Sequence, residues 1–204
     1  MILSQASVVS KLAVFSLHKD HLSTLKNMCG IGGMSTFIVP SSHVWQCMCV
    51  AQRLPPDSIT RLAFMANARN RMMPPLPDGY FGEAIINISV VEEAMSIASG
   101  DLAYVAGYIK GTIGWVDDGL VHSAVNYVEL ALAERDNRRT PATGNLPVTD
   151  ITAVNCLGLP LYDLDFGWGK PLAMLRAESS RGGLVHLVIY TEASVLKEFK
   201  HSKF

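Results

Sequence analysis

Residues 163–171 read Asp163-Leu164-Asp165-Phe166-Gly167-Trp168-Gly169-Lys170-Pro171, the stretch on which the interpretation of the fold depends. Its centre, DFGWG, sets two rare aromatic residues and two glycines in a fixed order. The glycines permit backbone angles or close approaches that a Cβ would forbid. We expect the tryptophan to anchor the loop in an apolar pocket. The stretch therefore predicts a braced loop with a structural role.

A second block occupies residues 69–82 and reads RNRMMPPLPDGYFG. Its prolines fix three φ angles and bias each preceding residue toward an extended conformation, so we expect a stiff loop. The arginines at its start are candidates for a bidentate ion pair with Asp165, which would pin the two blocks together. The residues of this loop that we single out are Arg69, Arg71, Pro74, Pro75, Gly79, Tyr80, Phe81 and Gly82.

The rest of the chain alternates between helical and strand-like hydrophobic patterns. Helical spacing predicts helices around 22–25, over 37–51 with Ser35 or Thr36 as cap, from Asp101, and after Asp117-Asp118. Strand-like stretches lie at 12–17, 61–68, 84–91, 149–157, 171–177 and 184–190, the last two as a hairpin; a loop over 134–147 and a final helix from Thr191 complete the pattern. This interleaved order predicts a mixed α/β (α+β) fold. We expect one domain over residues 1–204, with two small domains as the alternative.

The composition is short of charge, and this restricts the partners. Charged residues make up 17% of the chain, against about 25% in ordinary soluble domains. Such a deficit suggests an apolar surface that is meant to be covered. The net charge of -1 disfavours nucleic acid as a partner. Lys11 interrupts the first apolar run and the uncharged stretch 27–52 is too polar for a membrane span, so we expect a soluble, cytoplasmic protein.

The four cysteines show no metal-binding pattern. They are Cys29, Cys47, Cys49 and Cys156, without a C-x-x-C pair or an accompanying His-x-x-x-His spacing. We expect buried free thiols in a reducing compartment, and no metal.

The two blocks resemble the plant BAHD acyltransferases. DFGWG is similar to the carboxy-terminal signature of that family, and residues 69–82 are similar to its RxRxxPPLPxGYFGN block. The His43-Val44-Trp45 and Asp117-Asp118 segments also resemble their counterparts. The resemblance covers nearly the whole chain and corresponds to the carboxy-terminal half of the family. It implies a chloramphenicol-acetyltransferase-like half, a mixed β-sheet flanked by helices, with a channel running between two such halves.

The resemblance implies an activity that this chain does not carry alone. Family members transfer an acyl group, here expected to be hydroxycinnamoyl, from acyl-CoA to an amine or hydroxyl acceptor, with acyl-CoA as co-substrate and no permanently bound cofactor. Through the block at 69–82 and the Gly-Gly-Leu-Val segment near the end, the chain most resembles hydroxycinnamoyl transferases that act on amines such as agmatine or putrescine. The family's general base is the histidine of an HxxxD motif in the amino-terminal half. None of the six histidines here is followed by aspartate at the fourth position, so we expect no catalytic residue.

We therefore expect a truncated chain that is inactive alone and has a missing amino-terminal half or an intact relative as partner. The alternative is a non-catalytic module that interacts with such an enzyme or binds a CoA ester.

Four positions need separate interpretation. His122 is followed by Asn126, and without an orienting carboxylate it is interpreted as a surface histidine. Glu83 replaces the asparagine that ends the family block. Cys156 occupies a position that resembles the one held by a tryptophan in the hydroxycinnamoyl-transferring branch of the family. The resemblance implies that this position lies near the acceptor pocket, so Cys156 is an acceptor-pocket candidate. Ser41 and Ser42 precede His43, and we expect them to cap a helix.

Overall fold

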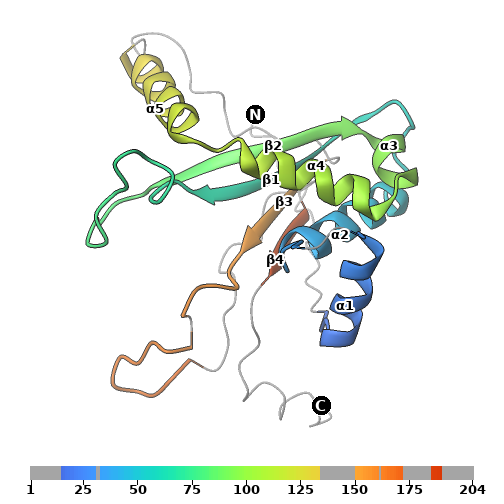
Figure 1. Cartoon of the computed structure of the whole chain (residues 1–204), viewed down its shortest axis with the longest axis horizontal. Coiled ribbons are helices and arrows are strands. Elements are labelled where there is room, and N and C mark those ends of the chain that lie inside the picture. The colour runs from blue at the N-terminus through green and yellow to red at the C-terminus, as the bar shows by residue number, and fades with distance from the viewer. Residues whose placement is uncertain (1–14, 31–32, 134–149, 161, 172–184, 190–204) are drawn as a thin grey trace, which may run out of the picture.

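The computed structural model describes residues 15–30, 33–133, 150–160, 162–171 and 185–189. A sheet carries helices on one of its faces, and one further helix projects from its end (Figure 1). The helices are α1 (Lys19–Met28), α2 (Ile38–Ala51), α3 (Ala94–Ser99), α4 (Leu102–Gly114) and α5 (Asp118–Ala133). The strands are β1 (Ile59–Asn67), β2 (Ile85–Glu93), β3 (Asp150–Asn155) and β4 (Val185–Ile189).

The four strands form one mixed sheet in the order β2-β1-β3-β4. β1 and β2 are antiparallel, and Leu62 lies opposite Val90. β3 runs parallel to β1, with Phe64 beside Ala153, and β4 runs parallel to β3. The expected mixed α/β fold is therefore confirmed.

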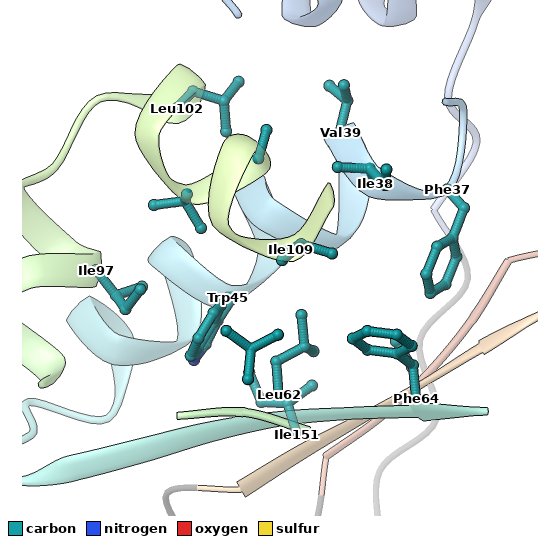
Figure 2. Packing of buried hydrophobic residues seen from close by; sticks show 14 of the residues in the cluster. Phe37, Ile38, Val39, Trp45, Leu62, Phe64, Ile97, Leu102, Ile109 and Ile151 are labelled. Atoms are coloured by element: carbon teal, nitrogen blue, oxygen red, sulfur yellow. The ribbon is translucent and has the colours of Figure 1, made fainter. Parts of the chain in front are cut away.

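Alternation along β1 decides which face of the sheet the helices cover. Thr60, Leu62, Phe64 and Ala66 are buried, whereas the residues between them are exposed or half-buried. This is the period-two pattern of a strand with one covered face, and it confirms the alternation predicted for 61–68. α2 and α4 lie over the buried side chains of β1 and β3 (Figure 2).

Trp45 lies in the middle of this core. Its side chain is fully buried between helix and sheet, near Leu62 and Ile109 (Figure 2). Its Nε1 donates a hydrogen bond to Thr60 Oγ1 at 3.0 Å, so the indole N–H is satisfied inside the core. Burial of large side chains such as this one is worth about 1.5–3 kcal/mol each and holds α2 on the sheet.

The start of α2 confirms one cap prediction and corrects another. Ser35 Oγ accepts a hydrogen bond from the Ile38 backbone N–H at 3.1 Å, as expected of a capping residue. Ser41 and Ser42 are not caps, because the helix begins at Ile38 and both lie inside it. Ser42 Oγ instead donates to the Ile38 carbonyl at 2.8 Å, a bond made one helical turn back.

Several expected elements fall on residues outside the described ranges. These are half of the strand at 12–17, the whole loop at 134–147, nearly all of the strand at 171–177, the turn before β4, and the final helix. Residues 15–17 and 171 are described and have no regular structure. The hairpin is thus untested, while its second strand is observed as β4.

Candidate functional site

The sequence-predicted residues gather at one end of the sheet. β1 and β3 are parallel, so their carboxyl ends lie at the same end. The loop of residues 68–84 leaves this end of β1, and the segment that contains Cys156 and DFGWG leaves the same end of β3. In Figure 1 both segments and α5 project away from α1, α2 and α3. The carboxyl ends of parallel strands are where open α/β sheets bind ligands.

Arg69 and Arg71 fasten the 68–84 loop by bonds to backbone carbonyls. Arg69 Nη2 donates to the Gly82 carbonyl at 2.6 Å and so closes the loop across its base. Arg71 Nη1 donates to the Ile113 carbonyl at 3.0 Å and to the Val116 carbonyl at 2.7 Å. The Ile113 carbonyl also accepts the Val116 N–H, so Arg71 adds a second donor at the end of α4 and binds the turn that follows it. The expected ion pair with Asp165 is wrong for these described residues, because both guanidinium groups serve the loop and α4 instead.

The aromatic end of the loop is packed on itself. The Tyr80 ring lies over Gly82, where an added Cβ would come within 2.7 Å of the ring. Phe81 is fully exposed. The loop therefore presents one aromatic side chain outward while it uses another to cover its own backbone.

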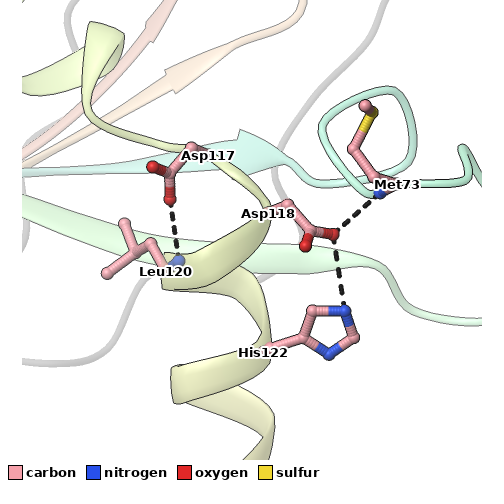
Figure 3. Close-up of polar contacts among 5 residues, drawn as sticks. All are labelled: Met73, Asp117, Asp118, Leu120 and His122. Carbon is pink, nitrogen blue, oxygen red and sulfur yellow. Dashed lines mark hydrogen bonds and ion pairs between the residues drawn. The ribbon is translucent and has the colours of Figure 1, made fainter.

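The start of α5 ties this loop to the helix (Figure 3). Asp117 Oδ1 accepts a hydrogen bond from the Leu120 N–H at 2.8 Å and caps the helix. Asp118 Oδ1 accepts one from the Met73 N–H at 2.7 Å. The same carboxylate lies 3.4 Å from His122 Nε2.

His122 thus has an orienting carboxylate, which the sequence interpretation had denied it. The signal was present, because residues four apart on a helix are neighbours and Asp118 stands four positions before His122. The imidazole remains 55% exposed. An exposed pair of this kind is an ordinary surface interaction, so the interpretation as a surface histidine is retained with a partner added.

The DFGWG loop is braced by its own carboxylate. Asp165 Oδ1 accepts hydrogen bonds from the Gly167 and Gly169 N–H groups, at 2.7 and 3.0 Å. Both glycines have positive φ, +93° and +96°, which confirms the need for glycine there. Phe166 and Trp168 are 78% and 94% exposed. The expected apolar pocket for Trp168 is therefore not formed by the described residues, and both rings are exposed.

Cys156 lies directly after β3 and is 8% exposed. Burial raises the pKa of its thiol. Burial likewise raises the pKa of the Cys29 and Cys49 thiols. The expectation of buried thiols is wrong for the remaining cysteine, Cys47, which is exposed.

Two further properties concern the described residues alone. Among them, no three His, Cys, Asp or Glu side chains are grouped so that they could hold a metal ion. None of the helices in this part of the chain has both the length and the apolar character needed to cross a membrane.

The 68–84 loop and the DFGWG loop both lie within a match to one protein family. The model of the Transferase family matches residues 5–194. The chain belongs to this family, the BAHD acyltransferases. The match includes the 68–84 loop and the DFGWG loop, the two segments that the sheet brings to one end.

Two curated relatives show how much of a BAHD protein the chain represents. It is 37% identical over 185 residues to putrescine hydroxycinnamoyltransferase 1 of Oryza sativa subsp. japonica, which covers 86% of this chain and 42% of the relative. It is 31% identical over 176 residues to shikimate O-hydroxycinnamoyltransferase of Nicotiana tabacum, covering 84% of this chain and 40% of the relative. The chain thus spans about two fifths of the length of these relatives.

Solved BAHD structures have the same fold. The likeness to vinorine synthase has a TM-score of 0.61 at 19% identity and covers 84% of this chain and 39% of that chain. The likeness to F. sporotrichioides TRI101, crystallised with coenzyme A and T-2, has a TM-score of 0.66 at 19% identity and covers 81% and 40%. The expected chloramphenicol-acetyltransferase-like fold is confirmed.

Proposed function

We propose that this chain forms one half of an acyl-CoA-dependent acyltransferase that moves a hydroxycinnamoyl group to an amine or hydroxyl acceptor. The observation that carries the proposal is the 37% identity to the Oryza putrescine hydroxycinnamoyltransferase over 86% of this chain. This relative is named for putrescine, an amine, which favours an amine acceptor. Acyl-CoA enters as co-substrate, in keeping with TRI101 having been crystallised with coenzyme A.

The reaction needs a proton acceptor that these residues do not supply. Attack of an amine or hydroxyl on a thioester carbonyl is accelerated about 10²- to 10⁴-fold by a positioned general base. The printed sequence contains no HxxxD motif. His122 is a poor substitute, because its carboxylate partner is shared with the Met73 N–H on an exposed helix. We therefore propose that the base comes from a second polypeptide segment, the amino-terminal half implied by the family.

The surface at the loop end of the sheet fits such a partner half. Phe81, Phe166 and Trp168 are large, apolar and exposed, and all three come from segments that leave this end. Covering each would contribute about 1.5–3 kcal/mol. α5 adds to this surface an apolar face made of Val125 and Val128, which are exposed, whereas Val121, one turn earlier in the helix, is buried. Phe81, Trp168 and the α5 face together supply the apolar surface that the low charge content suggests.

The partner half could be covalently joined or separate, and a fusion tests both the activity and its source. The chain is joined to the amino-terminal half of the Oryza relative and assayed with a hydroxycinnamoyl-CoA and either putrescine or shikimate. We expect turnover by the fusion with putrescine, and none by the 204-residue chain alone. Replacement of the HxxxD histidine by alanine in the fusion is the matched control and should abolish turnover. Turnover by the chain alone, well above the uncatalysed rate, would overturn the proposal that the general base comes from the amino-terminal half.

A second candidate function is a non-catalytic module that binds a CoA ester or an intact relative. The combination of exposed aromatic rings with no HxxxD histidine favours it. Calorimetry with a hydroxycinnamoyl-CoA and with the full-length relative distinguishes the two candidates. Binding by the chain, combined with a fusion that gives no turnover, would select the module; binding of neither ligand by the chain would reject it.

The structural unit and the location of the protein belong to the same proposal. α1, α2, α4 and the sheet share one hydrophobic cluster, which supports a single domain. A cytoplasmic location agrees with free thiols at all four cysteines.

A further inference from the structure

A thiol and an imidazole face each other on the exposed side of α2. Cys47 Sγ lies 3.7 Å from His43 Nε2, one helical turn away, and both side chains are exposed. They border a groove of about 350 Å³ whose other lining residues are Gln46, Val50, Ala51 and Ala98. The lining contains no Asp, Glu, Lys or Arg. A nucleophile with a neighbouring base therefore stands beside a shallow, open and largely apolar groove on the surface.

Gln46, which lines this groove, is held in place by two hydrogen bonds. Its Nε2 donates to the Ile97 carbonyl at 3.2 Å and to the Gly100 carbonyl at 2.7 Å. These bonds hold α2 against α3 and the turn after it. The backbones of the two helices that flank the groove are thus held together, although its lining includes exposed side chains.

The other three cysteines are unsuited to the same chemistry. Cys49 is only two positions further along α2, yet it points into the core and is 4% exposed. Its thiol donates to Thr60 Oγ1 at 3.9 Å. Cys29 and Cys156 are buried as well. Because the thiolate is the reacting form and burial in apolar surroundings disfavours it, these three thiols are internal controls for Cys47.

We propose that Cys47, with His43 as its proton acceptor, is a thiol–disulfide exchange site for small uncharged disulfides. The His43 imidazole takes the thiol proton, and the Cys47 sulfur attacks one sulfur of the disulfide. A protein mixed disulfide forms as the disulfide bond of the reagent breaks. The departing sulfur leaves as a thiolate and takes up a proton. Cys47 is oxidised, the departing thiol is the reduced product, and the retained half lies in the groove against Val50 and Ala98.

The reaction is tested on the full 204-residue chain with bis(2-hydroxyethyl) disulfide as the probe. The adduct is followed by intact-mass spectrometry and located by peptide mapping. We expect a single adduct, at Cys47, and its loss in Cys47→Ser. Comparable adduct formation at Cys29, Cys49 or Cys156 in the folded chain would overturn the proposal.

The role of His43 is tested by rate. We expect His43→Gln to slow adduct formation about tenfold, less than a fully positioned general base supplies, because the contact is long and exposed. His122→Gln, which removes an exposed histidine elsewhere, should leave the rate unchanged. His43→Asn is the second variant, in case His43→Gln alters the fold as judged by circular dichroism. Equal rates at Cys47 in the wild-type chain and in a folded His43 variant would remove the histidine from the site and overturn the proposal.

Discussion

Arg71 Nη1 donates a hydrogen bond to the carbonyl oxygen of Val116 at 2.7 Å, joining two residues 45 positions apart in the chain. The same nitrogen reaches the Ile113 carbonyl at 3.0 Å. A side chain of the 68–84 loop therefore binds the carboxyl end of α4 and the turn after it, and the loop cannot leave them without breaking both of these hydrogen bonds. This relationship makes the loop part of the folded domain.

Replacing Arg71 should destabilise the chain through those two carbonyls. Arg71→Met removes this donor from both carbonyls; the Ile113 carbonyl keeps the Val116 N–H, whereas the Val116 carbonyl loses its bond to the guanidinium, and we expect a loss of about 1–3 kcal/mol in the free energy of unfolding. Arg71→Lys should recover only part of it, because an ammonium lacks the planar fork of donors. Urea unfolding provides the measurement. Lys110→Met, an exposed charge on the same helix, is the control for loss of charge, and an equal effect there would refute the assignment.

A pair of glycines tests the backbone at the end of α3 and the interior of α4. At Gly100 an added Cβ would come within 2.5 Å of the Ser96 carbonyl oxygen, a backbone atom that cannot swing aside. Gly100→Ala should cost about 1–3 kcal/mol, as overpacking typically does. At Gly107, inside α4, an added Cβ meets nothing within 4 Å. Gly107→Ala should instead stabilise by about 0.5–1 kcal/mol, because alanine favours the helix. Thermal unfolding of both variants should move in opposite directions.

Local patterns predict the elements of this fold well, because each is determined by neighbours in sequence. The alternation in β1 and the cap at Ser35 both rest on short-range geometry. The pairing of β1 with β3 was not predicted, because its register joins segments almost 90 residues apart. That register is what brings Cys156 to the same end of the sheet as the 68–84 loop.

In the candidate site, too, some features that neighbours in sequence determine were predicted, and others were not. The positive φ of Gly167 follows from the DFGWG sequence, and so does a braced loop. The predicted partner of Asp165, an arginine, was wrong. A carboxylate two residues before a glycine can accept a hydrogen bond from the local backbone, and Asp165 makes this local bond in place of the expected ion pair. The exposure of Trp168 could not be predicted from residue type, since a large aromatic residue is equally suited to a core and to an interface.

Asp118 should matter more for the loop than for the histidine. Asp118→Ala removes the acceptor of the Met73 N–H, and we expect a loss of about 1 kcal/mol and faster hydrogen exchange at the Met73 amide. Asp118→Asn keeps an acceptor oxygen and should largely preserve protection. His122→Gln removes only an exposed pair, so it should cost less than about 1 kcal/mol and leave the Met73 amide protected. Exchange at Met73 that is the same in all variants would show that the bond does not hold the loop.

The buried thiols should make stability fall at alkaline pH. Burial is the main cause that raises the pKa of Cys49 above its ordinary value of 9.0, and it raises the pKa of Cys29 and Cys156 as well. Below pH 9 the thiols are neutral in both the folded and the unfolded chain. Above pH 9 the thiols of the unfolded chain ionise while those of the folded chain keep their protons. Ionisation lowers the free energy of the unfolded state alone, so the free energy of unfolding declines as pH rises.

The variant Cys49→Ser isolates this contribution, because serine does not ionise in this range. Its free energy of unfolding should be lower at pH 8, through altered core packing, but should decline less steeply than that of the wild-type chain between pH 9 and pH 10. Cys47→Ser, at the exposed position on the same helix, should keep the wild-type slope. Urea unfolding at each pH gives both slopes. If Cys49→Ser and the wild-type chain lose stability in parallel, the thiol of Cys49 is not the group whose burial resists ionisation.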